Sequence, residues 1–369
     1  MEVRAPRFDP CRCGVASRRT ITPIAEIVPD RCTPEYERTL ARMGSELPYR
    51  RARSLLEAFF PLGDAPDVET IRQRTLHVGA RIEREAKTLP AVAPPGEAPS
   101  IALAIDGGHV KAVRSYQGRS FEVFVAQVSN DEGNQVAFSS MPAEADRQAQ
   151  RLRGVLHDIG ATLRTPVTIL SDGADGPRSL GEEASIGRTH HVLDWFHLSM
   201  RVQHVAQAVK GGPDGTIEDR AEGARLADIV DQHIRWRLWH GQVKRAFDLI
   251  GDTLEPLDAM AKGGSPAAAQ AAKVAGVLRS LEAYVSGQSD LIIDYASARR
   301  SKEPISTATT ESTVQWLLHR RMGANQQMRW SPRGARLMLK ARTSVINGTF
   351  NKDHAAAERW ACRPFRNAA

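Results

Sequence analysis

Three short apolar runs, each followed by an aspartate, constrain the fold of this chain more than any other feature. The aspartates are Asp106 after Ile101–Ile105, Asp172 after Val167–Ser171, and Asp194 after His191–Leu193. Aliphatic and β-branched residues favour buried strands, and the Asp-Gly pairs at 106–107 and 172–173 are typical of turns. Open α/β sheets place their ligands at the carboxyl ends of strands. The sequence therefore predicts a sheet whose strand ends gather carboxylates.

The length and composition indicate a soluble protein of two or three domains. The chain has 369 residues, of which 41% are hydrophobic and 25% are charged. No apolar run approaches the roughly 18 residues that a membrane-spanning helix needs. The first residues lack the apolar segment of a signal peptide. We therefore expect a cytoplasmic protein with no membrane partner.

The charge balance favours a polyanionic partner. The formal net charge is +7 and the isoelectric point is about 9.4, and arginine supplies 41 of the 50 basic residues. Arginine pairs bidentately with phosphate and with guanine edges, so this bias suits nucleic acid. A GC-rich genome, which favours arginine codons, is the alternative explanation.

The four cysteines do not predict a disulfide framework in a chain of this length. They are Cys11, Cys13, Cys32 and Cys362. Cys11 and Cys13 are separated by one residue, whereas zinc knuckles use a two-residue gap. Free thiols in a reducing compartment are the preferred interpretation, and a metal site built on Cys11, Cys13 and Cys32 stays open as the alternative.

The region before residue 89 predicts a small helical DNA-binding module. Residues 1–32 form an Arg-, Pro- and Cys-rich segment, and residues 33–88 predict three helices, with Thr33 and Asp67 as helix caps. In the third helix, one apolar face leaves a polar and basic face as the candidate DNA contact. That face carries Arg72, Gln73, Arg74, His77 and Arg81. A plain helical hairpin with a solvated face is the alternative.

The rest of the chain predicts an α/β core interrupted by helices. A Pro-rich linker at 89–99 separates the module from core strands at 100–198. The predicted strands are 101–105, 110–116, 121–128, 167–171 and 191–193, with a helix at 143–159 and a short helix or turn at 175–184. This order predicts a mixed five-stranded sheet. Residues 199–302 predict a helical insertion, and 303–369 predict further helices and a basic tail.

Carboxylates that converge at strand ends suit hard divalent cations. Magnesium prefers oxygen ligands and takes only one or two carboxylates, with water and phosphate completing its coordination. Two such ions can hold both the attacking and the leaving oxygen of a phosphoryl displacement. Asp106, Asp172 and Glu311, which opens a late helix, are the candidate ligands for Mg²⁺ or Mn²⁺.

Each of these residues also has an ordinary explanation. An Asp-Gly pair after a strand is most often a simple turn, and a glutamate in a first helical turn complements the helix dipole. Asp175, Asp294 and Glu303 are rival candidates. A zinc site at His190, His191 and His197 lacks a second ligand cluster, and the loop at 173–176 lacks the Lys-Ser/Thr of a phosphate-binding loop.

Several motifs together resemble transposases of bacterial insertion sequences of the Kra type, which belong to the DDE class and are distantly similar to Mutator-like enzymes. The motifs are Ile105-Asp-Gly-Gly-His109, Leu170-Ser-Asp-Gly-Ala174, Asp194-Trp-Phe-His197, Thr309-Thr-Glu-Ser312, Leu47-Pro-Tyr-Arg-Arg-Ala52, Arg235-Trp-Arg-Leu-Trp239, Trp316-Leu-Leu-His-Arg-Arg321 and Met328-Arg-Trp-Ser-Pro-Arg333. The likeness covers nearly the whole chain and implies an RNase H-like core with a helical insertion before the catalytic glutamate.

The resemblance implies roles for individual residues. Asp106, Asp172 and Glu311 match the catalytic metal-binding triad, and Asp194 and His197 match an accessory Asp-x-x-His motif. In such enzymes water cuts a phosphodiester at the element's end, and the freed 3′-hydroxyl attacks target DNA. The resemblance also implies a homo-oligomer on DNA. Compared with the family, we expect the N-terminus to be shortened. The alternatives are an RNase H-like nuclease or resolvase without strand transfer, and a catalytically inactive transposon-derived DNA-binding protein.

Overall fold

The computed structural model describes residues 32–60, 65–85, 100–142, 145–210, 217–263, 266–306, 313, 315–323 and 328–361. The chain divides into two compact units. The sheet unit comprises 87–110 and 120–319, and the helical unit comprises 1–86, 111–119 and 320–369. Residues 1–31 of the predicted segment 1–32, the linker 89–99 and Glu311 lie outside the described residues.

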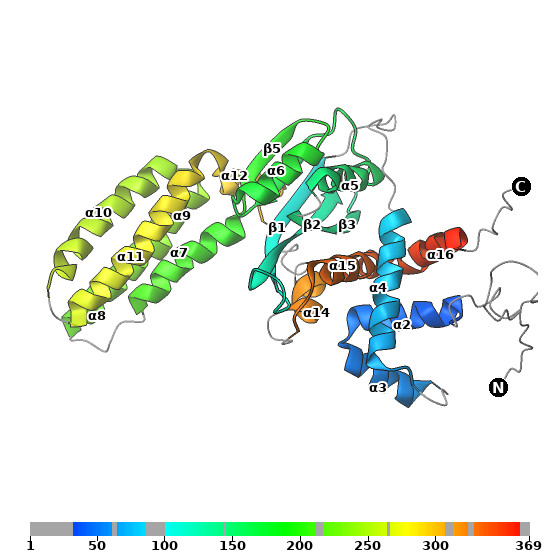
Figure 1. Cartoon of the computed structure of the whole chain (residues 1–369). Helices are drawn as coiled ribbons and strands as arrows, with labels where there is room; N and C mark the ends of the chain where they lie inside the picture. The colour runs from blue at the N-terminus through cyan, green and yellow to red at the C-terminus, as the bar shows by residue number, and fades with distance from the viewer. Residues whose placement is uncertain are drawn as a thin grey trace, which may run out of the picture. The chain divides into compact units, whose positions relative to one another are not determined.

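The sheet unit is built on one five-stranded mixed sheet (Figure 1). Its strands are β1 (Ile101–Lys111), β2 (Ser120–Asn130), β3 (Gln135–Ser140), β4 (Val167–Ser171) and β5 (Thr189–Leu193). They lie in the order β3-β2-β1-β4-β5. β1, β4 and β5 are parallel, whereas β2 and β3 are antiparallel to each other. The predicted α/β class with a mixed five-stranded sheet is therefore confirmed.

Two of the five predicted strands are wrong in detail. The first predicted strand, 101–105, runs on to Lys111, so residues 110 and 111 of the second predicted strand, 110–116, belong to β1 and no separate strand lies there. The missing member is β3, which sequence analysis left as a connection. The Asp106-Gly107 pair predicted a turn, but both residues lie within β1, and a Cβ on the next residue, Gly108, would lie 2.3 Å from Leu318 Cδ1. These glycines therefore mark a close approach to the strand.

Helices cover both faces of the sheet. One face packs on α5 (Ala145–Asp158) and α6 (Asp175–Ala184) through a core that includes Leu103, Leu152 and Ile169. The other face joins a core with the inserted helices through Ala104, Leu170 and Val192. Since side chains alternate along a strand, the neighbouring residues Ile169 and Leu170 pack into cores on opposite faces of the sheet.

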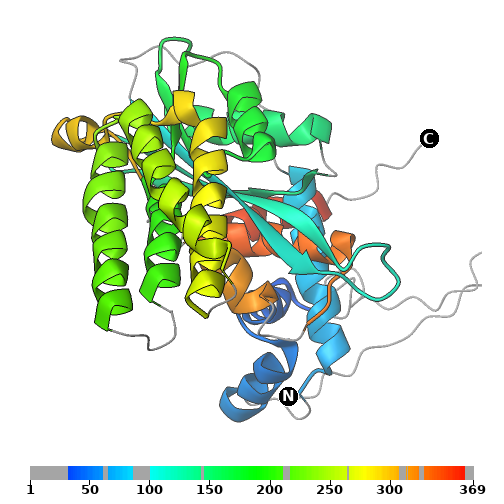
Figure 2. The same ribbon diagram turned by 90° about the vertical axis from the view of Figure 1, so that its left-hand side faces the viewer.

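The inserted helices form a bundle in which α7, α10 and α11 run side by side (Figure 2). Its members are α7 (Trp195–Lys210), α8 (Ile217–Asp228), the π-helical η2 (Ile229–Ile234), α9 (Arg235–Trp239), α10 (Val243–Ala261), α11 (Pro266–Gly287), the 3₁₀ turn η3 (Ser289–Leu291) and α12 (Tyr295–Arg300). Buried leucine, valine and alanine side chains hold them together. Beyond the bundle, the π-helical η4 (Gln315–His319) follows.

The helical unit joins the two ends of the chain. Its helices are α2 (Pro34–Glu46), α3 (Tyr49–Phe59), α4 (Val68–Glu85), α14 (Arg320–Met322), α15 (Pro332–Ile346) and α16 (Phe350–Ala361). Thr33 and Asp67 cap α2 and α4 as predicted, with Oγ1 and Oδ1 accepting from the Tyr36 and Thr70 amides. The sequence predicts one C-terminal region at 303–369 that holds the Glu311 helix, a basic helix and the tail. In the structure, α15 and α16 of that region pack with the N-terminal helices α2 and α4.

Two buried arginines link these distant segments at the C-terminal end of α2. Arg321 donates from Nε to the Gly44 carbonyl at 3.2 Å, and Arg342 donates to the Ser45 carbonyl. The Arg321 guanidinium lies over the Tyr49 ring, 4.3 Å from its centroid. Cationic groups at a helix C-terminus complement its dipole and satisfy its last carbonyls. Burial lowers the pKa of Arg342 to about 10, so it stays charged at neutral pH.

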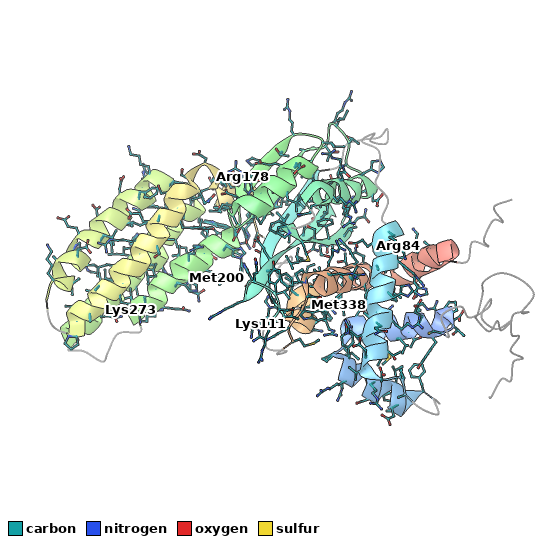
Figure 3. The ribbon with its side chains drawn as sticks, in the orientation of Figure 1. Arg84, Lys111, Arg178, Met200, Lys273 and Met338 are labelled. Atoms are coloured by element: carbon teal, nitrogen blue, oxygen red, sulfur yellow. The ribbon has the colours of Figure 1, made fainter. Side chains whose placement is uncertain are left out.

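Helices α4 and α15 touch through their backbones at Gly79. A Cβ added there would lie 2.1 Å from the Leu337 carbonyl oxygen, next to Met338, which is fully buried and labelled in Figure 3. We expect Gly79→Ala to destabilise the protein by about 1–3 kcal/mol, because the helices must move apart. Urea unfolding followed by circular dichroism measures the change.

Gly276→Ala in α11 is the matched control. No atom lies within 4 Å of an added Cβ there, so this change should be neutral or stabilise by about 0.5–1 kcal/mol through helix propensity. Equal unfolding midpoints for the two variants would contradict a backbone contact at Gly79.

Among the helices that the structure describes, none is both long enough and apolar enough to cross a bilayer.

Candidate active site on three parallel strands

The three predicted aspartates share one level of the parallel strands. Ala104 of β1 pairs with Leu170 of β4, and Ser171 of β4 pairs with Leu193 of β5. Continuing both registers places Asp106 beside Asp172 and Asp172 beside Asp194. Neighbouring strands are about 4.8 Å apart. The register therefore aligns three carboxyl-bearing residues in a row across the sheet.

The same alternation decides which way the aspartates face. Each lies two residues beyond a residue of the core shared with the bundle, namely Ala104, Leu170 and Val192. Side chains two apart in a strand share a face, so the row faces the inserted helices. Asp194 is fully buried, whereas Asp106 and Asp172 are partly exposed. Solvent therefore reaches the latter two.

Asp194 is held at the start of α7 and in turn holds His197. Its Oδ1 accepts from the Phe196 amide at 3.0 Å, and its Oδ2 lies 2.7 Å from His197 Nδ1. Burial of the imidazole works to lower its pKa. The hydrogen bond with Asp194 and the charges of Asp194, Asp106 and Asp172 outweigh that effect and raise the His197 pKa. The accessory pair is thus assembled, and His197 responds to both partly exposed aspartates.

Two bundle tyrosines fix the strand ends that carry the aspartates. The Tyr284 hydroxyl of α11 donates to the Asp172 carbonyl at 2.7 Å, and the Tyr295 hydroxyl of α12 donates to the Leu193 carbonyl at 2.8 Å. Burial raises the pKa of Tyr284 to about 12 and that of Tyr295 further. Both hydroxyls therefore remain protonated donors at neutral pH.

Gln288 completes the support of the Asp172 turn. Its Nε2 donates to the Gly173 carbonyl at 3.1 Å. Gly173 has a φ of +89°, and a Cβ there would lie 2.6 Å from Gln288 Cδ, so a side chain is excluded both by conformation and by space. Tyr284 lies in the last turn of α11 and Gln288 is the residue after that helix, so the C-terminal end of α11 binds two successive carbonyls.

Sequence analysis did not identify Tyr284, Gln288 or Tyr295. They lie more than 100 residues from the carbonyls that they bind, and they occur within ordinary helical patterns. The sequence signal for them is indirect. Gly173 follows Asp172 at a strand end, and a glycine at such a place indicates that another side chain packs closely against the backbone.

His191 and His197, which are close in the sequence, form hydrogen bonds with different side chains. His191 Nε2 lies 2.7 Å from Ser171 Oγ, whereas His197 pairs with Asp194. Burial and the nearby Arg178 lower the pKa of His191. In the described part of the chain the histidines therefore do not act as one cluster, as a zinc site would require.

We expect Asp194→Asn to lower the pKa of His197, because the variant loses the charge that contributes most to raising it. The raised pKa means that protonated His197 stabilises the fold below pH about 6.5, and that this contribution is lost as the pH rises through the folded-state pKa. That pH dependence should flatten in the variant. An NMR titration of the histidine rings measures both effects.

His191 is the internal control for this titration, since Asp194 does not contribute to its shift. If the His191 signal moves as far as that of His197, Asp194 acts on the fold as a whole and not on its hydrogen-bonded partner.

The carboxylates at this site can be compared with the ligands that a magnesium ion requires. Asp106 and Asp172 supply partly exposed carboxylates on adjacent strands, which matches the one or two carboxylates that magnesium takes in proteins. Among the described residues, no group of three or more His, Cys, Asp or Glu side chains is placed to hold a metal ion. The predicted third ligand, Glu311, lies outside them. The two aspartates thus fit part of a magnesium site.

The rival carboxylates are used differently. The Asp294 side chain caps α12 by accepting from the Ser297 amide at 2.9 Å. Asp175 begins α6, and Glu303 is exposed in the connection after α12.

The predicted DNA-contact face of α4 is not an open face. α4 packs against α2, α3, α15 and α16, and Arg81 is buried, with Nη1 donating to Glu37 Oε2 at 2.8 Å. Arg74 and His77 also contact Glu37, at 3.3 and 3.2 Å. The sequence pattern predicts that only the apolar face of this helix is buried. Because four helices surround α4, polar side chains such as Arg81 are buried as well.

Arg72 and Gln73 remain exposed near the start of α4, where Arg72 pairs with Glu69. The more open basic surface of this unit lies on α3. There Arg50, Arg51 and Arg53 are exposed, and none forms an ion pair with a carboxylate in the described part of the chain. The Cys11–Cys13–Cys32 alternative lies mostly outside the described residues; of the three, the structure describes Cys32, whose thiol donates to the Thr33 carbonyl at 3.6 Å.

No protein-family model matches this chain, and no curated protein matches it either.

Proposed function

We propose that this chain is a DDE-type transposase, which cuts DNA in a metal-dependent reaction and joins the cut end to a target. The observation that carries the proposal is the row of Asp106, Asp172 and Asp194 on three adjacent parallel strands. Carboxylates that gather on adjacent strands repel one another, and such clusters are typical of sites where a cation or a catalytic function uses them.

The sheet topology supports the RNase H-like part of this proposal. Three successive strands, β1 to β3, lie side by side, and β4 and β5 add in parallel beyond β1. This order agrees with the core that the family resemblance implies. The described residues around the Glu311 segment belong to the same unit: the Ile305 carbonyl accepts from the Trp195 amide, and Thr313 donates to Gln127 of β2.

Asp106 and Asp172, with Glu311, would hold the divalent cations of such a site. When bound, these ions would supply positive charge for the phosphoryl oxygens and activate the attacking hydroxyl. Asp194 positions His197 through Nδ1, which leaves Nε2 as the group that can donate to a phosphate oxygen. Tyr284 and Gln288 hold the backbone around Asp172, so that its carboxylate is oriented before substrate binds.

The reaction has two balanced steps. Water attacks the phosphorus, the bond from phosphorus to the 3′-oxygen breaks, and the products are a 3′-hydroxyl and a 5′-phosphate. The 3′-hydroxyl then attacks a phosphodiester of the target, which forms one bond and releases one target 3′-hydroxyl. The first step hydrolyses one phosphodiester and the second exchanges one phosphodiester for another, so neither step needs an external energy source.

The test uses the full chain with DNA that carries the terminal sequences flanking its own gene, in Mg²⁺ or Mn²⁺. Gel analysis of end-labelled DNA separates cut from joined products. Metal-dependent joined products are the expected result. Cutting without joining would establish a nuclease or resolvase, and DNA binding without either product would leave a DNA-binding protein.

A further inference from the structure

The bundle carries a cation at the edge of the aspartate row. Arg201 of α7 is exposed, and its guanidinium carbon lies 3.9 Å from the centroid of the Tyr284 ring. Met200, labelled in Figure 3, marks this part of α7. Tyr284 is the residue whose hydroxyl binds the Asp172 carbonyl. One aromatic side chain therefore contacts both the candidate catalytic turn and the arginine.

The contact orients Arg201 without neutralising it. Among the described residues, no carboxylate forms an ion pair with Arg201. By contrast, Arg279 on the same bundle is exposed but paired with Asp258. Stacking on an aromatic ring holds the planar guanidinium in place, and a stacked guanidinium still has N–H donors that can bind an anion.

A polyanionic substrate needs such a cation here. Asp106, Asp172 and Asp194 all repel phosphate, and metal ions would offset that repulsion only at the carboxylates themselves. His197 and Arg201 are four residues apart on α7, and His204 follows three residues later. Residues at this spacing share one helix face and rise about 6 Å per four residues. His197, Arg201 and His204 therefore form a line of polar and basic side chains on one face of α7, and this line extends away from the aspartates.

We propose that Arg201, held by stacking on Tyr284, binds a backbone phosphate of the DNA strand that enters the aspartate site. This inference rests on the proposed function for the choice of DNA as substrate. It adds that the inserted bundle contributes directly to substrate binding, besides supporting the sheet.

The experiment measures DNA binding separately from cleavage. Fluorescence anisotropy with a short labelled single-stranded oligonucleotide in EDTA, where no metal-dependent cutting occurs, compares wild type, Arg201→Gln, Arg201→Lys and the control Arg279→Gln. We expect Arg201→Gln to weaken binding about tenfold and to reduce the salt dependence by about one phosphate contact. Arg201→Lys should recover part of the lost binding, because lysine keeps the positive charge but lacks the planar guanidinium that stacks on Tyr284.

Tyr284 variants separate stacking from hydrogen bonding. Tyr284→Phe keeps the ring and should bind the oligonucleotide more tightly than Tyr284→Leu, which removes the ring and should bind like Arg201→Gln. Circular dichroism checks that each variant is folded.

Binding by Arg201→Gln that equals binding by Arg279→Gln would overturn the inference, whether or not the wild type cuts DNA. Wild-type protein that does not bind the oligonucleotide would overturn it as well. The wild type could also bind the oligonucleotide without ever cutting DNA. If Arg201→Gln then loses binding while Arg279→Gln does not, the result would support the phosphate contact and refute the transposase proposal.

Discussion

Asp172→Asn is expected to reduce metal-dependent DNA cleavage by at least about 1000-fold, while the protein remains folded. The amide keeps the shape of the side chain, and the Asp172 carbonyl still accepts from Tyr284. It removes the charge on which cation binding depends, and metal-ion catalysis contributes several kcal/mol to such reactions, at about 1.4 kcal/mol per factor of ten. Single-turnover cleavage of end-labelled DNA in Mg²⁺ measures the loss.

Asp175→Asn is the matched control. It removes the same charge three residues further on, where Asp175 is exposed in the first turn of α6, so cleavage should stay within about threefold of wild type because the residue complements only the helix dipole. Titration calorimetry with Mn²⁺ adds a readout that does not need activity. Asp172→Asn should bind the ion more weakly than Asp175→Asn. Equal binding and equal cleavage would exclude Asp172 from the site.

Glu37→Gln is expected to cost about 3–5 kcal/mol of stability, because it leaves buried cations without their counter-charge. Glu37 is nearly inaccessible and contacts Arg81 at 2.8 Å, together with Arg74, His77 and His354. It links α2, α4 and α16 within the helical unit. Urea unfolding measured at pH 7 gives the difference in free energy.

The same group predicts a pH dependence. Burial alone would raise the pKa of Glu37, but hydrogen bonds from His354 and His77 and the charge of Arg81 hold it well below its usual range. Its contribution is therefore fully present above pH about 4.3, the unfolded value, and is lost as the pH falls towards the folded-state pKa. Wild-type protein should lose stability over this acidic window, and Glu37→Gln should lose less.

Glu46→Gln provides the comparison on the same helix. Glu46 pairs with Arg42 at 3.1 Å, but both side chains are about half exposed. Exposed pairs contribute at most about 1 kcal/mol, so this variant should unfold close to wild type at every pH. A Glu46→Gln effect as large as that of Glu37→Gln would show that charge in general, and not the buried cluster, stabilises the unit.

The candidate site was predictable from the sequence only in part. Asp172 and Asp194 follow strands whose ends the apolar runs predicted correctly. Asp106 was also identified, although it lies within β1 and not at its end. The reason is that an Asp-Gly-Gly stretch has the composition of a turn, and only the approach of Leu318 to Gly108 explains why glycines occur inside a strand.

The sequence by itself determined the local elements. Thr33 and Asp67 cap their helices, β4 and α6 have the predicted bounds, and the Asp-x-x-His spacing places Asp194 and His197 one helical turn apart. These features depend on interactions between residues that are neighbours in the chain, so their patterns can be recognised without knowledge of the fold.

Only the tertiary structure decided which distant groups meet. The strand register aligns the three aspartates, α11 brings Tyr284 to a carbonyl 112 residues away, and α4 directs Arg81 to Glu37 across 44 residues. Arg81 and Arg50 have similar polar surroundings in the sequence, yet one is buried and the other exposed. That difference depends on how many helices pack around each one. Local propensity does not encode it, because packing is settled by the whole set of buried surfaces at once.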